Sequence, residues 1–363
     1  MKAEITINAT SSSYQALVGK GILEAGLSEC FKDKTHDKLF VLIDENVFKH
    51  HWTAIESTLS KLVDHIHYLE VPEGEGSKSV TFWSKTLDFL LNEGVRRNVP
   101  LVVIGGGVTG DLGGFTAATA LRGIPLIHIP TTILGMVDSS IGGKTGINHT
   151  SGKNLIGSFY QPEMVIADIN FLNSLPKREW MNGLSEILKY GVIRDDKIFE
   201  EARIFLEEDL QAINPENLIQ LIAKCIQIKA DVVEKDEFEG GIRAFLNYGH
   251  TFAHALEKAC DFDTISHGEA VFLGMLAAQE LSNLTGANLQ TTKLKPYRSL
   301  YEFKVSKDGL SYEQLNEYMK SDKKRTDEHI KFVLLEAWQQ PVVKTVKKEA
   351  LINKAWDVVF DEL

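Results

Sequence analysis

Short, continuously apolar segments alternate with amphipathic helical ones in the first half of this chain, and this alternation limits the possible folds most strongly. We expect strands at residues 38–44, 65–71, 101–104, 126–129 and 164–167. We expect helices at residues 52–63 and 80–91. A strand that is apolar at every position offers no face to water, so both of its faces must be covered. The pattern predicts a parallel-rich α/β sheet with helices on both faces.

After about residue 176 the pattern becomes mainly helical. We expect helices at residues 179–190, 198–210, 217–234, 247–260, 269–284 and 312–320. One late strand is expected at residues 332–335. A chain of 363 residues is long enough for two hydrophobic cores. We therefore predict an α/β domain over residues 1–176 and a mainly α-helical domain over residues 177–363.

Charge and cysteine usage exclude several classes of partner. The chain carries 50 acidic and 39 basic residues, a net charge of −11, which disfavours nucleic acids and anionic membranes but still allows a local basic pocket for a small anion. Cys30, Cys225 and Cys260 are far apart, as is typical of free thiols in a reducing compartment. No apolar run is long enough to span a bilayer, and the N-terminus lacks a signal-peptide core. We expect a cytoplasmic protein.

A pair of histidines in the second half indicates a metal site. His250 and His254 are four residues apart, so on a helix they share one face. His267 and Glu186 add a further imidazole and a carboxylate. Two imidazoles and one carboxylate form a three-ligand set that leaves one position open on a catalytic metal ion. Histidines with this spacing are also found as core or capping residues, and the spacing alone leaves both interpretations open.

The position of His267 suggests the start of a helix. Ser266 and Glu269 flank it with the spacing of a capping box, and the apolar run 271–281 follows. The pattern predicts that His267 lies in the first turn of a helix.

A glycine-rich segment follows the expected strand 101–104. It contains Gly105-x-Gly107-x-x-Gly110, a spacing that permits a tight turn and lets backbone N–H groups approach a pyrophosphate at a helix N-terminus. No acidic residue follows at the distance where dinucleotide-binding proteins bind the ribose hydroxyls. Asp44, at the end of an earlier strand, is a candidate for that contact. A plain strand-to-helix turn is the alternative.

Two more loops resemble phosphate-binding loops. Residues 73–78 follow an expected strand, and residues 138–146 combine glycines, hydroxyl groups and a lysine. Neither has the Walker A spacing. Each alone is equally typical of a solvated turn, but the three loops together favour one mononucleotide or dinucleotide site.

At these residues the chain resembles the 3-dehydroquinate synthase family over nearly its whole length. The matching segments are residues 105–111, 130–132, 137–146, 152–162, 186–191, 243–247, the pair His250 and His254, residues 267–271 and residues 322–324. The resemblance implies a Rossmann-like NAD domain followed by a helical metal-binding domain. It implies NAD and Zn²⁺ or Co²⁺ as cofactors, Glu186, His250 and His267 as metal ligands, and a homodimer.

The resemblance also implies a reaction, the second step of the shikimate pathway. 3-Deoxy-arabino-heptulosonate 7-phosphate is oxidised transiently by NAD, loses phosphate, is reduced again and closes by intramolecular aldol addition to 3-dehydroquinate. Because this substrate carries a carboxylate and a phosphate, its pocket needs several cations.

The motif match implies roles for individual residues. Arg243 and Lys229 resemble the carboxylate clamp, Asp138 and Lys189 would orient the reacting hydroxyls, and Arg122 would reach the neighbouring subunit's site. The phosphate and polar shell would comprise Lys144, Asn154, Asn247, His254 and one of Lys323 or Lys324. The implied NAD contacts are Asp44, Asn46, Glu73, Glu75, Lys78, Gly106, Gly107, Val108, Thr109, Gly110, Asp111, Thr131, Thr132, Asp138, Lys144, Lys153, Phe171, Leu172, Asn173 and Ser174. Any one of the cations alone is equally typical of a solvated surface, and Asp138 of a turn or cap.

Three alternatives differ in testable ways. Another sugar phosphate cyclase would act on a substrate without the carboxylate and would tend to lack the match at Arg243, Asn247 or His254, all present here. A metal-dependent polyol or alcohol dehydrogenase would release NADH. A non-catalytic binding homologue would be expected to have lost a ligand or a lysine, and none is missing from the motifs.

Overall fold

The structure, a computed structural model, describes residues 2–32, 36–206, 209–260, 264–289, 293–322 and 330–363. It contains two compact units, each described by itself below. The first comprises Met1–Trp180 together with Gln211–Phe238, and the second comprises Met181–Leu210 together with Glu239–Leu363. Among the described residues, none of the helices combines the length and apolar character needed to cross a membrane.

A seven-stranded sheet forms the centre of the first unit. Its strands, in chain order, are β1 (Lys2–Asn8), β2 (Ser13–Gly19), β3 (Lys38–Asp44), β4 (His65–Val71), β5 (Leu101–Gly105), β6 (Leu126–Pro130) and β9 (Met164–Asp168). They are arranged as β1-β2-β9-β6-β5-β3-β4, in which β1 is antiparallel to β2 and the other neighbours are parallel. The predicted parallel-rich sheet is confirmed.

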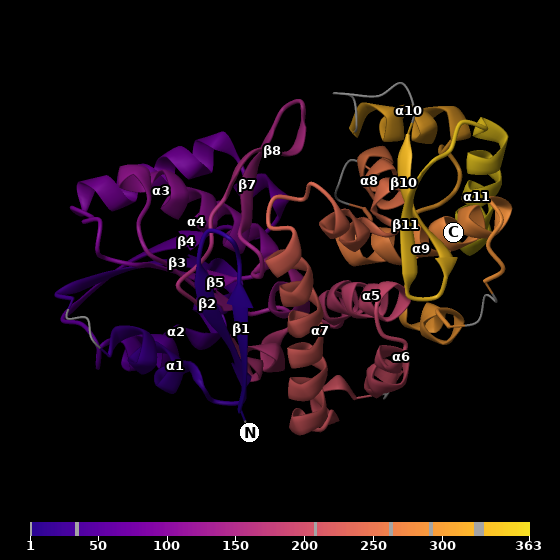
Figure 1. Cartoon of the computed structure of the whole chain (residues 1–363). Helices are drawn as coiled ribbons and strands as arrows, with labels where there is room; N and C mark the ends of the chain where they lie inside the picture. The colour runs from indigo at the N-terminus through magenta and orange to yellow at the C-terminus, as the bar shows by residue number, and fades with distance from the viewer. Residues whose placement is uncertain (1, 33–35, 207–208, 261–263, 290–292, 323–329) are drawn as a thin grey trace. The chain divides into compact units, whose positions relative to one another are not determined.

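Helices cover both faces of this sheet, as continuously apolar strands require. Along β3, Val41 packs in one core cluster with α1 (Leu23–Phe31) and α2 (Glu45–Leu59). The next residue, Leu42, packs in a second cluster with α3 (Val80–Asn92) and α4 (Gly107–Thr119). Successive side chains of a strand point to opposite faces, so β3 supplies both cores. Figure 1 shows α3 and α4 on one side of the strands and α1 and α2 on the other.

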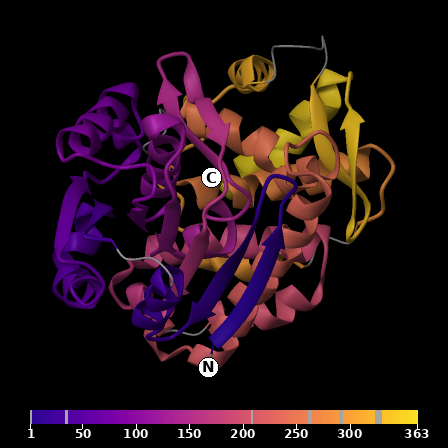
Figure 2. The same cartoon turned by 60° about the vertical axis from the view of Figure 1, so that its left-hand side comes forward.

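The first unit also contains a helix from later in the chain. Helix α7 (Pro215–Lys235) packs against β1 and β2, whereas its sequence position had placed it with the helical half. The carboxylate of Glu237, just past α7, accepts hydrogen bonds from the backbone N–H of Ser11 (2.8 Å) and from the side chain of Gln161 (2.9 Å). The first bond ties the end of α7 to the turn of the β1–β2 hairpin, the indigo ribbon in Figure 2, and the second ties it to the segment that follows β8.

A second hairpin and several short helices complete this unit. Strands β7 (Lys144–His149) and β8 (Gly152–Phe159) pair antiparallel. The short helices are η1 (Glu75–Ser77), η2 (Ala120–Arg122), the π-helix η3 (Gly135–Ser139), η4 (Ile169–Ser174) and η6 (Leu210–Ala212), which spans the boundary between the two units. Within the predicted phosphate loop at residues 138–146, η3 ends at Ser139 and β7 begins at Lys144, so the turn itself comprises residues 140–143, and its contact with a phosphate stays a prediction.

The second unit is mainly helical, as predicted. Its elements are α5 (Lys177–Ile193, from Met181 on), α6 (Lys197–Glu201), η5 (Ala202–Leu206), η7 (Ile242–Asn247), α8 (His250–Ala259), α9 (His267–Leu284), η8 (Lys295–Leu300), α10 (Tyr312–Asp322), β10 (Lys331–Ala337), β11 (Gln340–Thr345) and α11 (Glu349–Glu362). Phe252 of α8 joins the core elements, with its ring 5.0 Å from Trp356 of α11 and 5.3 Å from Phe332 of β10. Figure 1 labels these elements.

Two helix predictions in this half are wrong, each for a local reason. The helix expected at 198–210 ends at Glu201 and continues as a 3₁₀-helix. Ile198 is buried too, and the buried residues Phe199, Ala202 and Phe205 are three apart, which fits the 3₁₀ repeat. The helix expected at 247–260 begins only at His250, because Gly249 has φ +81° and cannot continue a right-handed helix.

A buried histidine lies under the helix that follows β5. His128 of β6 is 6% exposed, and a Cβ added at Gly110 or Gly114 of α4 would come within 4 Å of its ring. Burial lowers the pKa of His128 to about 4, from an ordinary 6.5. The folded protein therefore resists a proton that the unfolded chain binds below pH 6.5.

We expect His128→Leu to reduce the acid sensitivity of the fold. The wild type should lose up to about 3 kcal/mol of stability through this group as the pH falls from 6.5 to 4, because the shift spans about 2.5 pH units. The variant has no such site. Urea unfolding at several pH values measures the difference in slope, and above pH 7 the two proteins should differ by a constant amount. Parallel curves down to pH 4 would contradict the prediction.

Candidate active site

Three predicted metal ligands meet in the second unit. Glu186 lies on α5, and His250 and His267 are the first residues of α8 and α9. The Nε2 atoms of both histidines are 3.6 Å from Oε1 of Glu186. Each residue offers one ligand atom, and these atoms all lie within 4.8 Å of one another. Two imidazoles and a carboxylate at this separation could hold one divalent ion.

Close backbone packing at two glycines brings these three helices together. A Cβ at Gly274 of α9 would lie 2.3 Å from the carbonyl oxygen of Gly249, which directly precedes His250. A Cβ at Gly268, which directly follows His267, would lie 2.3 Å from Cα of Asn182 on α5. The side chain of Asn182 also accepts the N–H of Gly268 (3.1 Å). Each histidine is therefore next to a point where two backbones touch, which fixes the distance between ligands.

The predicted capping box at the start of α9 is confirmed. The hydroxyl of Ser266 accepts the N–H of Glu269 (3.4 Å), and the carboxylate of Glu269 accepts the N–H of Ser266 (2.8 Å). This arrangement places His267 at the first helical position.

The second nitrogen of each histidine also has a partner. Nδ1 of His250 lies 3.2 Å from the carbonyl oxygen of Tyr248, and Nδ1 of His267 lies 3.5 Å from Oε1 of Glu257. Metal-bound histidines usually donate their second N–H in this way, which selects the tautomer and orients the ring. Both Nε2 atoms then face Glu186 and are available as ligand atoms, so the residues present fit a metal ion.

The charged groups of this cluster lie close enough to shift one another's pKa values. Lys189 contacts Oε2 of Glu186, and both side chains are fully buried, which confirms that these residues, three apart, share a helix face. Burial, reinforced by Lys189, lowers the pKa of His250 well below its usual range. Burial opposes protonation of His267 too, but Glu186 and Glu257 outweigh it and raise its pKa. His250 therefore has a free electron pair for a metal, and binding at His267 would displace a proton.

The first unit contains the expected nucleotide loop at a topological switch point. The chain runs from β3 to β4 on one side of β3 and returns to β5 on the other, so the switch point lies at the carboxyl ends of β3 and β5, where sheets of this kind bind ligands. Gly106 is the N-cap of α4 and Gly107 its first residue. A Cβ at Gly105 would lie 2.7 Å from Thr109 and one at Gly106 would lie 3.1 Å from Thr132, so the turn leaves little room for side chains at these two positions. This arrangement fits the pyrophosphate of a dinucleotide.

Asp44, the candidate ribose contact, is the N-cap of α2. Its carboxylate accepts the N–H groups of Asn46 (2.9 Å) and Val47 (3.3 Å). Burial raises its pKa above the ordinary value. Its established contact is thus structural, and its contact with a ribose stays a prediction.

The loop after β4 reaches α4 through charged side chains. Lys78 forms an ion pair with Asp111 (2.5 Å), and Glu75 accepts a hydrogen bond from Asn148 (2.7 Å). A Cβ at Gly74 or Gly76 would meet no atom within 4 Å. Several predicted NAD contacts therefore gather around the N-terminal half of α4.

The structure also joins two residues that are far apart in the sequence. The ammonium group of Lys229 on α7 donates to the carbonyl oxygen (2.7 Å) and the carboxylate (2.8 Å) of Asp138. Lys229 is the predicted clamp for the substrate carboxylate and Asp138 is predicted to orient a hydroxyl group, so the residues with these two roles form one ion pair.

The other predicted residues differ in their surroundings. Arg243 is 1% exposed, so it is not a solvated surface charge. Asn247 donates to Glu239 (2.6 Å), and the ring of His254 is 5.6 Å from that of His250. The exposed ones are Arg122, Lys144 and Asn154, and the half-buried Lys153 lies on β8. Lys323 and Lys324 lie outside the described residues.

Residues 171–174, implied as NAD contacts, belong to η4. Its hydroxyl residue Ser174 lies 2.6 Å from Nε2 of His51 on α2, and Phe171 packs in the core beneath α2. This segment is therefore anchored to the helix that follows β3.

Sequence reasoning missed Glu257 and Asn182, the neighbours that orient His267 and Gly268. One signal was available for Glu257. It lies seven residues after His250 and three after His254, so all three share a face of α8.

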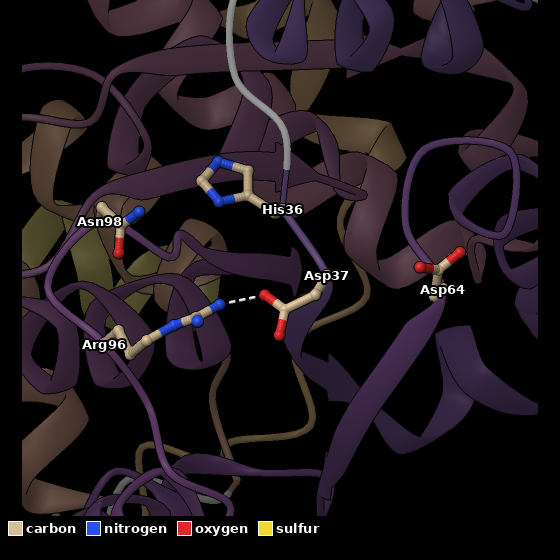
Figure 3. A pocket seen from close by; sticks show the side chains of 5 residues that line it. All are labelled: His36, Asp37, Asp64, Arg96 and Asn98. Carbon is tan, nitrogen blue, oxygen red and sulfur yellow. Dashed lines mark hydrogen bonds and ion pairs between the residues drawn. The ribbon is translucent and has the colours of Figure 1, made fainter.

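A cavity of about 460 Å³ lies elsewhere in the first unit. Figure 3 shows its lining residues, with the guanidinium of Arg96 directed at the carboxylate of Asp37. Asp37 and Asp64 directly precede β3 and β4, so this cavity lies at the amino ends of the strands. Ligands of open α/β sheets bind at the carboxyl ends, and both side chains of the ion pair are more than half exposed. We do not assign the site to this cavity.

An α/β unit with a glycine-capped helix at its switch point, combined with a helical unit carrying a histidine–carboxylate triad, defines a class of nucleotide- and metal-dependent enzymes. Family models identify the member of this class. The 3-dehydroquinate synthase N-terminal model matches residues 68–182, and the 3-dehydroquinate synthase C-terminal model matches residues 183–325. The chain belongs to the 3-dehydroquinate synthase family.

Relatives and solved structures agree with this assignment. A 3-dehydroquinate synthase of Salinibacter ruber is 40% identical and covers 88% of this chain and 87% of its own. Another, of Syntrophotalea carbinolica, is 39% identical and covers 94% of both chains. A crystal structure of 2-deoxy-scyllo-inosose synthase with carbaglucose-6-phosphate, NAD⁺ and Co²⁺ has a TM-score of 0.84 and 26% identity, and covers 99% of this chain and 100% of the other.

Proposed function

We propose that this chain converts 3-deoxy-arabino-heptulosonate 7-phosphate to 3-dehydroquinate and phosphate. The observation that carries the proposal is the cluster of Glu186, His250 and His267, with the partners that orient it, in a chain whose family match spans residues 68–325. A core or capping role would not require two Nε2 atoms at 3.6 Å from one carboxylate oxygen.

Glu186, His250 and His267 would hold a zinc or cobalt ion, and the glycine loop of the first unit would hold NAD. When bound, NAD supplies a reversible hydride acceptor and the metal a Lewis acid for hydroxyl and carbonyl oxygens. The neighbour solved with NAD⁺ and Co²⁺ supports both cofactors. We assign NAD binding to the α/β domain, predicted at residues 1–176 and joined in the structure by α7. Metal binding, and substrate binding through residues such as Arg243, belong to the helical domain predicted at residues 177–363.

The chain's own residues would bind and orient the substrate. Arg243, fully buried, offers a planar fork for the carboxylate. Lys229 holds Asp138 in one orientation through two hydrogen bonds, so that its carboxylate can accept a proton from a hydroxyl group. Lys189 forms an ion pair with Glu186 and so holds the carboxylate of this ligand in place.

The remaining polar shell would receive the phosphate. Its members would be Lys144, Asn154, Asn247, His254 and one of Lys323 or Lys324. Cations are needed here because the leaving phosphate carries negative charge.

We further propose a cytoplasmic homodimer. Arg122 is exposed and lies in a turn where Leu121 and Arg122 both have positive φ (51° and 66°). Such strained backbone is often found at functional sites, and it supports a contact of Arg122 with a neighbouring subunit's site.

One assay tests the reaction. Supplied with the heptulosonate phosphate, a divalent metal ion and NAD at far below the substrate concentration, the enzyme should release phosphate and 3-dehydroquinate in equal amounts. No net NADH should accumulate, because the same carbon is oxidised and reduced again. NADH equal to product would instead identify a dehydrogenase. Turnover of glucose 6-phosphate or a heptulose phosphate, without turnover of the heptulosonate, would identify another cyclase.

A further inference from the structure

Glu257 is a buried carboxylate to which the proposed mechanism assigns no role. It lies on α8 and is 3% exposed. Its Oε1 atom is 3.5 Å from Nδ1 of His267, the first residue of the next helix. The contact therefore joins the two histidine-bearing helices at the ligand itself.

The position of Glu257 is unfavourable for the helix that carries it. Helix α8 ends at Ala259, so Glu257 lies in its last turn. The C-terminus of a helix carries partial negative charge, and a carboxylate there is destabilising. Burial adds a further cost for a charged group. Helix stability thus does not account for a carboxylate at this place, whereas its contact with His267 does.

The two histidine ligands also differ in how strongly their surroundings restrict the side chain. The side chain of His250 is 12% exposed and that of His267 is 33% exposed, so packing alone restricts His267 less. His250 has a neutral backbone carbonyl, that of Tyr248, as its Nδ1 partner. His267 has a carboxylate, which both orients the ring and makes the imidazole a stronger electron donor.

We propose that Glu257 is a positioning residue that holds His267 with Nε2 directed at the metal ion and so slows loss of the ion. The inference rests on the proposed metal site. It concerns retention of the metal rather than any step on the substrate.

The test compares Glu257→Gln and Glu257→Ala with the wild type. The dissociation constants of Zn²⁺ and Co²⁺ are measured by competition with a chelator, and the rate of metal loss by transfer to excess chelator. We expect about 10- to 100-fold weaker binding for Glu257→Ala. Glu257→Gln, which retains a neutral acceptor of the same size, should lie between the two. The visible spectrum of bound Co²⁺ should change for Glu257→Ala, because the ring of His267 is then free to turn.

Glu269→Gln is the matched control. Glu269 is a buried carboxylate two residues from His267, and it accepts a hydrogen bond from the N–H of Ser266. Glutamine is also accepted at this position of a capping box. The control should bind metal as the wild type does, which would separate the contact with His267 from the loss of a nearby charge.

The outcomes separate this inference from the proposed function. A wild type that binds no stoichiometric metal would overturn the metal site itself. A wild type that binds metal, with Glu257 variants of equal affinity, rate of loss and Co²⁺ spectrum, would overturn only the role of Glu257. If Glu257→Ala does not fold, Glu257→Gln decides, since wild-type rates of metal loss in that variant contradict the proposal.

Discussion

Replacing His250 with alanine should remove the bound metal ion and lower turnover by at least about a hundredfold. Loss of one of three ligands leaves a two-residue site, and Lewis-acid stabilisation of the reacting oxygens is worth several kcal/mol. Each 1.36 kcal/mol of barrier corresponds to a tenfold change in rate. Metal content per subunit, measured after dialysis, should fall together with the rate of phosphate release.

Two controls make this result specific. In the wild type, a chelator should abolish activity, and added Zn²⁺ or Co²⁺ should restore it. His50→Ala removes an exposed imidazole from α2 and should leave metal content and turnover unchanged. Full metal content with full turnover in His250→Ala would disprove the assigned ligand set.

The continuously apolar strands could be predicted because each position carries a residue type that is typical of a buried site. Residues 101–104 and 164–167 fall within β5 and β9, in which every residue is buried. The β1–β2 hairpin was missed because β1 lies at the sheet edge and buries only alternate residues, such as Ile5 and Ile7. Alternation over so few residues is a weaker signal. Helix α7 was predicted as a helix but placed with the wrong unit, because an amphipathic pattern shows that a helix has a buried face and not what covers it.

Local spacing carried most of the candidate site. The capping box placed His267 at a helix start, and a spacing of three residues brought Glu186 next to Lys189. Contacts between distant segments left no such pattern. The ion pair of Lys229 with Asp138 joins residues 91 positions apart, so only the folded chain shows that these two predicted roles are coupled.

The glycines beside the ligands illustrate the same limit in physical terms. Nothing in the local sequence pattern singles out Gly249, yet with its left-handed backbone it forms the N-cap from which α8 begins at His250. Gly274 lies within the apolar helical run 271–281 and belongs to no motif, although a Cβ there would lie 2.3 Å from the carbonyl oxygen of Gly249. A glycine required by close approach leaves no periodic signal, because the reason for it lies in another helix.

Arg243→Lys should lower kcat/KM for the heptulosonate phosphate by at least about tenfold. A guanidinium binds a carboxylate through two parallel hydrogen bonds, whereas an ammonium group offers a single point charge. Loss of such a contact in a desolvated site costs about 2–5 kcal/mol. Arg243 is 1% exposed, so water does not screen the difference. Steady-state kinetics on the intact substrate and on an analogue without the carboxylate measures the effect.

The comparison of the two substrates identifies what Arg243 recognises. If it binds the carboxylate, the variant should lose proportionally less activity on the analogue that lacks this group. Arg203→Lys, at a side chain that is 66% exposed, is the matched control and should change neither value. Thermal unfolding and metal content of both variants show whether the second unit is intact. Equal losses on both substrates, in a folded and metal-bound variant, would mean that Arg243 contacts another part of the substrate. Discrimination between the heptulosonate and other sugar phosphates would then depend on other residues, of which Lys229 is the first to replace.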